Sequence, residues 1–330
     1  MNILKLLFLT IMLSLALNAD SGEKEQTLKI HKDIYTNVVL KNAKDALSNI
    51  ELLSDLILAK EQNKAKEHFT DFVSAWKKVQ AFYILGDLDE EYLDTPRFID
   101  IFHQGNEDIK SQLDLILASE DKVSDIIYKN SHKSINALEY LLFKKDITDK
   151  RVNEALLLAT SAIKNHLEDI HNGYQAKEKE FYDDDKKANA MIINALIEST
   201  YKLKEWRVAD VAGYSKKYKN NPDITRGEYY ISKNSKTALL AILSTYKAVM
   251  DSTKYKDFGD YFKEVVKIEE VDMVVKNINK SIELTKKIKN DDLRDTKKLY
   301  KSLKKVHIGF YIYLIDALKM NAKILDADGD

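Results

Sequence analysis

Three polar residues in the middle of the chain have types and a spacing that could do chemistry. In the run NSHKSINALEYLLFKKD, His132, Asn136 and Glu139 stand at positions i, i+4 and i+7. On one α-helix such side chains lie on the same face, about a turn apart. An imidazole and a carboxylate are common metal ligands, whereas an amide oxygen suits only a hard ion. The spacing alone favours the plainer interpretation, a solvated polar stripe.

Other candidates lie in two stretches where the helical pattern stops, residues 86–106 and 207–232. Asp100 stands in the first stretch, and Glu228 and Ser232 flank a pair of tyrosines in the second. Long ordered loops in compact proteins are often functional. Structural roles also remain open, because Asp100 could pair with a nearby arginine and Ser232 could cap the next helix. The chain has no HExxH sequence, which excludes the commonest helical zinc-protease motif.

The elements that must position these residues are helices. The chain has two prolines and nine glycines in 330 residues, very little for a protein rich in strands and turns. Apolar residues instead recur every three or four positions. This periodicity predicts helices over residues 24–60, 64–85, 106–119, 122–145, 149–182, 186–206, 233–251, 258–290 and 292–325. The sequence therefore predicts an all-α protein.

The first nineteen residues are typical of a secretory signal peptide. Lys5 is followed by the apolar run Leu6 to Leu17 and then by Ala19, a small residue at the expected cleavage point. The run is about 18 Å long as a helix, too short for the roughly 30 Å core of a bilayer. The chain has no cysteine to carry a lipid or form a disulfide. We therefore expect a periplasmic or secreted protein with no transmembrane segment in the mature chain.

Charge and length limit the remaining possibilities. The chain has 52 basic and 53 acidic residues, so it offers no electrostatic case for binding nucleic acid. The mature length exceeds that of one typical core, which favours two domains. We expect helical bundles over residues 20–183 and 184–325, followed by an acidic tail over 326–330. A single, irregular all-α domain remains the alternative.

Several segments match the motif of a known family. The run SINALEYLLF, residues 134–143, is similar to a G-x-H-x-x-E helix followed by an aromatic residue and leucines, with Ser134 for the glycine and Asn136 for the histidine. Three further segments follow in the same order as in the family: AWKKVQAFYILGDLD, PRFIDIF and GEYYISKNSKTALLAIL. On these segments the chain resembles the imelysin family, also called peptidase family M75, over most of its mature length.

The resemblance implies two four-helix-type bundles related by an internal pseudo-repeat, with a functional site at their junction. Carried over to this chain, the ligand-binding residues would be Asn136, Glu139, Glu228, Ser232 and Asp100. For a metal ion, divalent or ferric, we expect Glu139 and Glu228 as ligands, with His132 in place of the missing motif histidine. Carboxylates with neutral oxygen donors suit a hard cation.

The resemblance further implies a role in iron acquisition. We therefore expect a periplasmic protein that binds a metal ion or a small ligand and works with iron-uptake components of the cell envelope. One alternative is an M75-like metallopeptidase that uses His132. Against it, a hydrolytic metal site needs about three protein ligands, and His132 lies about 10.5 Å from Glu139 along a straight helix. The other alternative is a non-catalytic helical scaffold that binds a partner protein.

Overall fold

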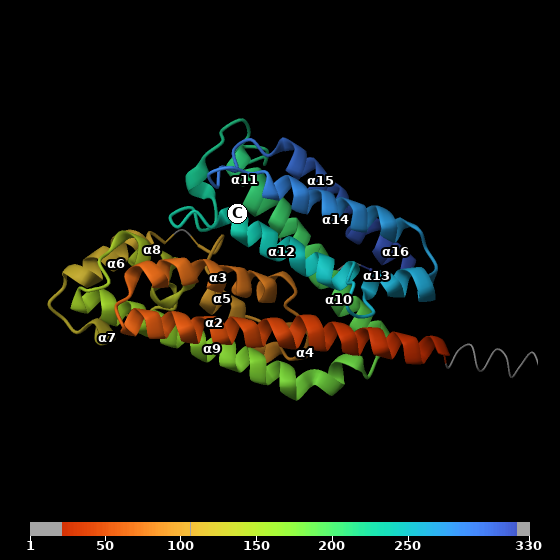
Figure 1. The fold of residues 1–330 in the computed structure, drawn as a ribbon, viewed down its shortest axis with the longest axis horizontal. Coiled ribbons are helices and arrows are strands. Elements are labelled where there is room, and N and C mark those ends of the chain that lie inside the picture. The colour runs from red at the N-terminus through yellow and green to blue at the C-terminus, as the bar shows by residue number, and fades with distance from the viewer. Residues whose placement is uncertain (1–21, 106, 322–330) are drawn as a thin grey trace, which may run out of the picture.

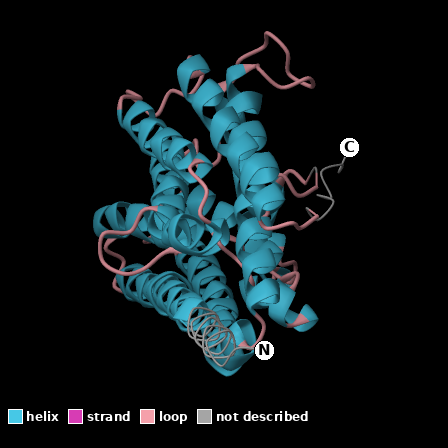
Figure 2. Cartoon of the chain, turned by 90° about the vertical axis from the view of Figure 1, so that its right-hand side faces the viewer, coloured by secondary structure: helices cyan, strands magenta, loops and turns pink. Residues whose placement is uncertain are grey.

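The structure is a computed structural model that describes residues 22–105 and 107–321. The expected signal peptide and the expected acidic tail lie outside these residues. All regular secondary structure in the described part is helical, without strands (Figures 1 and 2). The all-α expectation is therefore confirmed. None of the described helices is long and apolar enough to cross a membrane.

The first half of the chain is built on three long antiparallel helices. Residues 22–34 are helical and continue through a π-helical turn, η1 (Tyr35–Leu40), into α2 (Lys41–Leu58). Helices α3 (Gln62–Ala81) and α9 (Lys150–Tyr182) pack against α2 (Figure 1). Shorter helices join α3 to α9: α4 (Leu85–Leu88), η2 (Glu90–Tyr92), α5 (Thr95–Ile99), α6 (Ile109–Ala118), α7 (Val123–Ile126), η3 (Ser131–Lys133) and α8 (Ile135–Lys144).

The second half repeats the use of long helices but contains more π-helical turns. Its long members are α10 (Asp185–Lys202), α12 (Ser235–Met250), α14 (Glu270–Lys286) and α15 (Lys297–Ile308). The shorter members are η4 (Leu203–Ala209), α11 (Asp210–Ala212), η5 (Ile224–Arg226), α13 (Phe258–Asp260), η6 (Tyr261–Val266), η7 (Gly309–Leu314) and α16 (Ile315–Ala317). Helix α12 packs against α14 on one side and against α3 of the first half on the other.

Several predicted boundaries were wrong for identifiable reasons. The expected helix over 122–145 is broken, because Ser134 has extended backbone and caps α8 by accepting a hydrogen bond from the Ala137 amide. The expected helix over 258–290 is interrupted where Lys267 adopts a left-handed conformation with φ of 63°. The expected loop over 86–106 contains part of α4 together with η2 and α5.

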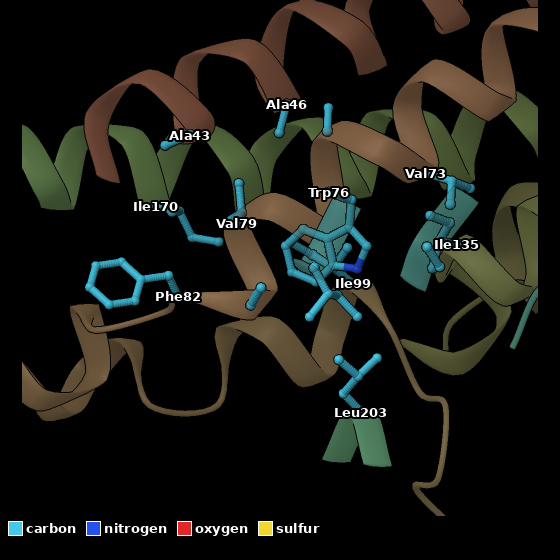
Figure 3. Packing of buried hydrophobic residues seen from close by; sticks show 14 of the residues in the cluster. Ala43, Ala46, Val73, Trp76, Val79, Phe82, Ile99, Ile135, Ile170 and Leu203 are labelled. Carbon is cyan, nitrogen blue, oxygen red and sulfur yellow. The ribbon is translucent and has the colours of Figure 1, made fainter. Parts of the chain in front are cut away.

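The hydrophobic core continues through both halves. Figure 3 shows Trp76 of α3, which is fully buried, beside Ile99 of α5, Ile135 of α8 and Leu203 of η4. Helix α9 ends at Tyr182 and α10 begins at Asp185, and the expected division into two bundles between residues 183 and 184 stays a prediction. Because the buried apolar side chains form one cluster across that boundary, each half needs the other to cover its core. The internal pseudo-repeat stays a prediction.

Candidate functional site

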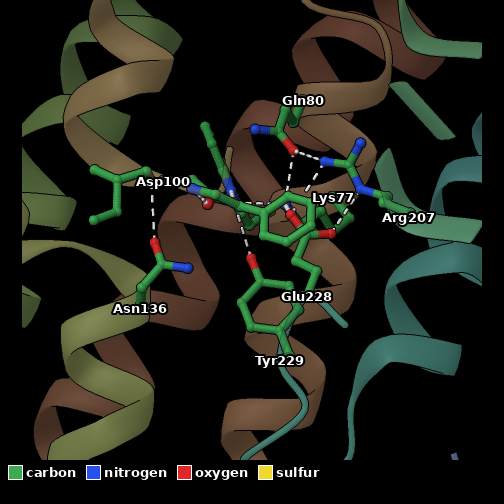
Figure 4. A network of polar contacts seen from close by, with 10 residues as sticks. Lys77, Gln80, Asp100, Asn136, Arg207, Glu228 and Tyr229 are labelled. Carbon is green, nitrogen blue, oxygen red and sulfur yellow. Dashed lines mark hydrogen bonds and ion pairs between the residues drawn. The ribbon is translucent and has the colours of Figure 1, made fainter. Parts of the chain in front are cut away.

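A buried lysine lies at the centre of a polar cluster between the two halves. The side chain of Lys77 on α3 is fully buried, and its Nζ lies 2.5 Å from Asp100 Oδ2 and 2.5 Å from Glu228 Oε1 (Figure 4). It also donates a hydrogen bond of 2.7 Å to Gln80 Oε1. A buried ammonium group requires such partners, since its transfer from water costs several kcal/mol.

Arg207 supplies the second cation of this cluster. It lies in the π-helical turn η4, and its Nε donates to Glu228 Oε2 at 2.6 Å while its Nη2 donates to Glu228 Oε1 at 3.1 Å. This two-pronged contact is the strong geometry for a guanidinium and a carboxylate. Nη2 also donates to Gln80 Oε1 at 3.0 Å. Two cations therefore balance the two carboxylates, Asp100 and Glu228.

Asp100 is the most heavily bonded carboxylate of the cluster. Besides Lys77, its Oδ2 accepts hydrogen bonds of 3.0 Å from Trp76 Nε1 and from the Tyr229 hydroxyl. Its Oδ1 accepts a hydrogen bond of 3.0 Å from the Phe102 amide. Burial by itself raises the pKa of Asp100, but the charge of Lys77 and these hydrogen bonds outweigh it and lower the pKa to about 2. Asp100 is therefore ionised at neutral pH.

Glu139 is buried under very different conditions. It lies on α8, and its Oε1 accepts hydrogen bonds from the Ser232 amide at 2.8 Å and from the Ser232 hydroxyl at 2.6 Å. Among the described residues no side chain forms an ion pair with it. Burial raises the pKa of Glu139 to about 7, an effect that the bonds from Ser232 only partly offset. This carboxyl group therefore exchanges a proton near neutral pH.

Asn136 holds the loop that contains Asp100. Its Oδ1 accepts a hydrogen bond of 3.0 Å from the Ile101 amide, as Figure 4 shows. Asn136 and Glu139 are three residues apart on α8, so both lie on the same face of the helix. The amide therefore joins the first irregular stretch to the helix that carries Glu139.

His132 does not belong to that face. It lies in η3, before the extended Ser134, so the expected stack of His132, Asn136 and Glu139 on one helix was wrong. Its Nε2 lies 2.8 Å from Gln112 Oε1. Within residues 22–105 and 107–321, no three histidine, aspartate or glutamate side chains converge so as to hold a metal ion. The combination of Glu139, Glu228 and His132 therefore does not fit a single ion.

A cavity of about 630 Å³ opens between α8 and the segment over residues 217–231. Asn136, Glu139 and Glu228 all line it. Ser232 reaches it through its bonds to Glu139, and Asp100 lies behind it in the ionic cluster. Three of the five expected ligand-binding residues thus line the cavity, Ser232 is bonded to one of them, and Asp100 shares Lys77 with another, although they come from both halves of the chain.

The sequence alone did not identify the two cations of the cluster, nor the pairing of His103 with Asp210 at the rim of the cavity. Lys77 had a detectable signal, because it stands four residues after buried Val73 on the apolar face of α3. At the rim, His103 Nε2 lies 3.1 Å from Asp210 Oδ2, and its ring stacks on Trp206 at a centroid distance of 4.7 Å. His103 has a left-handed backbone conformation, with a φ of 60°, which the sequence does not predict.

The chain is thus an all-α protein with a polar cavity where its two helical halves meet. The Imelysin family model, also named peptidase M75, matches residues 33–309, and the chain therefore belongs to the imelysin family. No curated protein matches the chain significantly.

Two solved structures are similar in fold. One is an imelysin-like protein from Psychrobacter arcticum 273-4, with a TM-score of 0.74 and 16% identity over 91% of this chain and 98% of that one. The other is described as an iron-regulated protein A precursor from Parabacteroides distasonis ATCC 8503, with a TM-score of 0.66 and 15% identity over 90% of this chain and 95% of that one. These similarities extend over nearly the whole length of both proteins.

Proposed function

We propose that the chain is a binding protein of the imelysin family that takes a small ligand into the cavity beside Glu139. The observation that carries the proposal is the environment of this carboxyl group. Glu139 lines the cavity, is 4% exposed, and is bonded only to Ser232 among the described residues. Its Oε1 accepts both of those bonds, which leaves Oε2 for a ligand. Binding sites commonly combine a concave surface with a few converging polar groups.

The contacts of the other expected residues favour a small ligand over a bare metal ion. Both oxygens of Glu228 are bonded to Lys77 or Arg207, so a metal ion would have to displace a buried cation. His132 is not among the residues that line the cavity. A divalent or ferric ion could still enter as part of a chelate, with Glu139 as its contact to the protein.

The cellular part of the proposal rests on other observations. A role in iron acquisition is supported by the similarity in fold to a protein described as an iron-regulated protein A precursor. Export to the periplasm is supported by the residue pattern of the first nineteen positions. Detection of a mature chain that begins at Asp20 tests the export.

The decisive experiment compares the wild-type chain with Glu139→Gln. Glutamine keeps the shape of the side chain and an oxygen that can accept the bonds from Ser232. Each protein is exposed to divalent and ferric ions and to a small-molecule extract, desalted, and analysed for retained metal and ligand by mass spectrometry. We expect the wild-type chain to retain a ligand and to melt at a higher temperature with it, since binding to the native state stabilises that state.

A matched control makes the comparison specific. Glu283→Gln is the same chemical change at an exposed position on α14, where Glu283 pairs with Lys286. We expect this variant to retain the ligand as the wild-type chain does. If the wild-type chain retains nothing, or if Glu139→Gln and the wild type retain the same species equally, the proposal is wrong.

A further inference from the structure

We propose that α15 and η7 form a docking surface for a bilayer of anionic phospholipids. The surface has two parts, a row of exposed lysines on α15 and a group of exposed apolar side chains on η7. Figure 1 shows α15 at the edge of the molecule, on the side away from α2 and α9. None of these side chains lines the cavity beside Glu139, so the surface would act independently of the proposed ligand site.

The outer side of α15 is uniformly basic. All the fully exposed residues of this helix are lysines: Lys297, Lys298, Lys301, Lys304 and Lys305. Its buried residues include Leu299, Leu303 and Val306, which pack into the core. Residues three and four apart share one face of a helix, so the lysines form a continuous row. With the other described residues, none of the five forms an ion pair or a side-chain hydrogen bond.

The acidic residues nearby do not cancel this charge. Residues 270–321 contain twelve basic and seven acidic side chains, whereas the whole chain has 52 and 53. Glu283 on the neighbouring helix α14 pairs with Lys286. The exposed carboxylates Asp295 and Asp316 lie beyond the two ends of the surface. A nearly neutral chain therefore has a local excess of positive charge around α15.

Three apolar side chains follow the lysines along the same helical axis. Tyr311, Ile312 and Tyr313 of η7 are 46%, 49% and 41% exposed. A helix on the surface of a globular protein normally turns such residues toward the core. The ring of Tyr311 stacks on that of His307, with the centroids 5.7 Å apart. Tyrosine is enriched where lipid headgroups meet the acyl chains, because its ring is amphipathic.

A bilayer accounts for both parts of the surface. The lysines would contact the phosphate groups of the lipids, and the apolar side chains would enter the boundary between headgroups and acyl chains. The sixteen steps from residue 297 to residue 313 correspond to about 24 Å of helix. Because α15 and η7 follow one axis, both parts could lie along a flat bilayer at the same time.

The test is co-sedimentation of the protein with lipid vesicles. The chain that begins at Asp20 is used, because it contains every described residue but lacks the apolar run over residues 6–17. One set of vesicles is phosphatidylcholine alone, and the other contains phosphatidylcholine and phosphatidylglycerol in equal parts. We expect the chain to bind the anionic vesicles about tenfold more tightly than the neutral ones, and more weakly as salt is raised.

Substitutions of the lysines locate the binding. The triple variant Lys301→Gln, Lys304→Gln and Lys305→Gln should bind anionic vesicles about tenfold more weakly, because each lysine near a charged bilayer adds to the attraction. The matched control removes three exposed lysines of the first half, by Lys29→Gln, Lys44→Gln and Lys150→Gln. This control has the same net charge as the test variant and should bind as the wild-type chain does.

A second pair of variants tests the apolar part. Ile312→Ser should weaken binding to anionic vesicles roughly fivefold, since less apolar surface enters the bilayer. Leu58→Ser is the control at an exposed position of α2 and should have no effect. Circular dichroism checks that each variant is folded.

The proposal is wrong if neutral and anionic vesicles bind equally, if neither binds, or if a control variant weakens binding as much as its test variant. It is also wrong if Ile312→Ser binds as the wild-type chain does, because a surface that recognises charge alone would fit an acidic protein equally well. The proposed ligand site beside Glu139 would be unaffected by any of these results.

Discussion

The ionic cluster behind the cavity and the wall of the cavity each bury a carboxyl group. Their surroundings shift the pKa of that group in opposite directions. Asp100 in the cluster has a pKa of about 2, whereas Glu139 at the wall has a pKa of about 7. Burial pushes both values upward. What differs is the neighbour, because Lys77 lies 2.5 Å from Asp100, whereas Glu139 accepts bonds from the Ser232 amide and hydroxyl and forms no ion pair with a described residue.

Hydrogen bonds from neutral donors therefore do not keep the buried Glu139 carboxyl group ionised at neutral pH. With two hydrogen bonds from Ser232, the pKa of Glu139 is still raised to about 7. A full positive charge beside Asp100 instead reverses the effect of burial on its pKa. The cluster therefore acts as a fixed, charge-balanced link between the halves. The wall of the cavity remains responsive to pH and to ligands.

The largest effect is expected when the positive charge of Lys77 is removed from the ionic cluster. Lys77→Met leaves Asp100 and Glu228 buried, with Arg207 as the remaining cation of the cluster. We expect the free energy of unfolding to fall by about 3–5 kcal/mol, the usual cost of breaking a buried ion pair. Urea unfolding followed by circular dichroism measures it.

The control for this variant is Lys78→Met, the same change at the next position of α3, where the side chain is only partly buried. Its effect should be much smaller. Equal losses in the two variants would show that the cluster contributes no more than an ordinary surface lysine.

The next prediction concerns Glu139 at the wall of the cavity and the pH dependence of stability. The folded chain binds a proton at Glu139 more tightly than the unfolded chain does, because the pKa rises from 4.5 to about 7 on folding. The stabilisation by this proton is complete below about pH 4.5 and is lost as the pH rises through 7. The difference corresponds to roughly 3 kcal/mol.

Glu139→Gln isolates this contribution from the other titrating groups. Between pH 4.5 and pH 7 the stability of the wild-type chain should decline relative to that of the variant, by roughly 3 kcal/mol. Urea unfolding of both proteins across that range provides the measurement. Parallel curves would mean that Glu139 titrates in the folded chain as it does in the unfolded one.

The smallest expected effect is that of removing the Ser232 hydroxyl group. Ser232→Ala removes the hydroxyl that donates to Glu139 Oε1 at 2.6 Å but keeps the amide donor. The pKa of Glu139 should rise further, and the stability at pH 8 should fall by about 1 kcal/mol. Carboxyl-carbon NMR titration measures the pKa. Ser244→Ala is the control, since that hydroxyl donates to the Ala241 carbonyl within α12, and a shift of Glu139 in this control would contradict the assignment.

The sequence was sufficient for the helical class, and it singled out residues from both halves that the structure places close together. Periodic apolar residues predicted the long helices α3 and α9 closely, because an amphipathic stripe needs only local information. The family motif led to Asn136 and Glu139, and the second-half segment led to Glu228 and Ser232. The contact between Glu139 and Ser232 confirms that these two segments meet.

The errors came from interactions that the local pattern does not contain. The break before α8 depends on a single serine that adopts an extended backbone and caps the helix. The role of Glu228 as a partner of Lys77 and Arg207 depends on a π-helical turn that directs Arg207 inward. The turn does not follow from hydrophobic periodicity, and the position of Lys77 on the apolar face of α3 does not reveal its partners. A carboxylate that looked like a metal ligand, Glu228, is therefore paired with two cations.

The ion pair between Lys77 and Glu228 also affects how the chain folds during its synthesis. These residues are 151 positions apart in the sequence. A nascent chain that has emerged only as far as α9 contains Lys77 and Asp100 but lacks Glu228 and Arg207. Contacts of such long range form late and slow the folding of a protein. The first half should therefore remain open, with its lysine hydrated, until the last third of the chain has been synthesised.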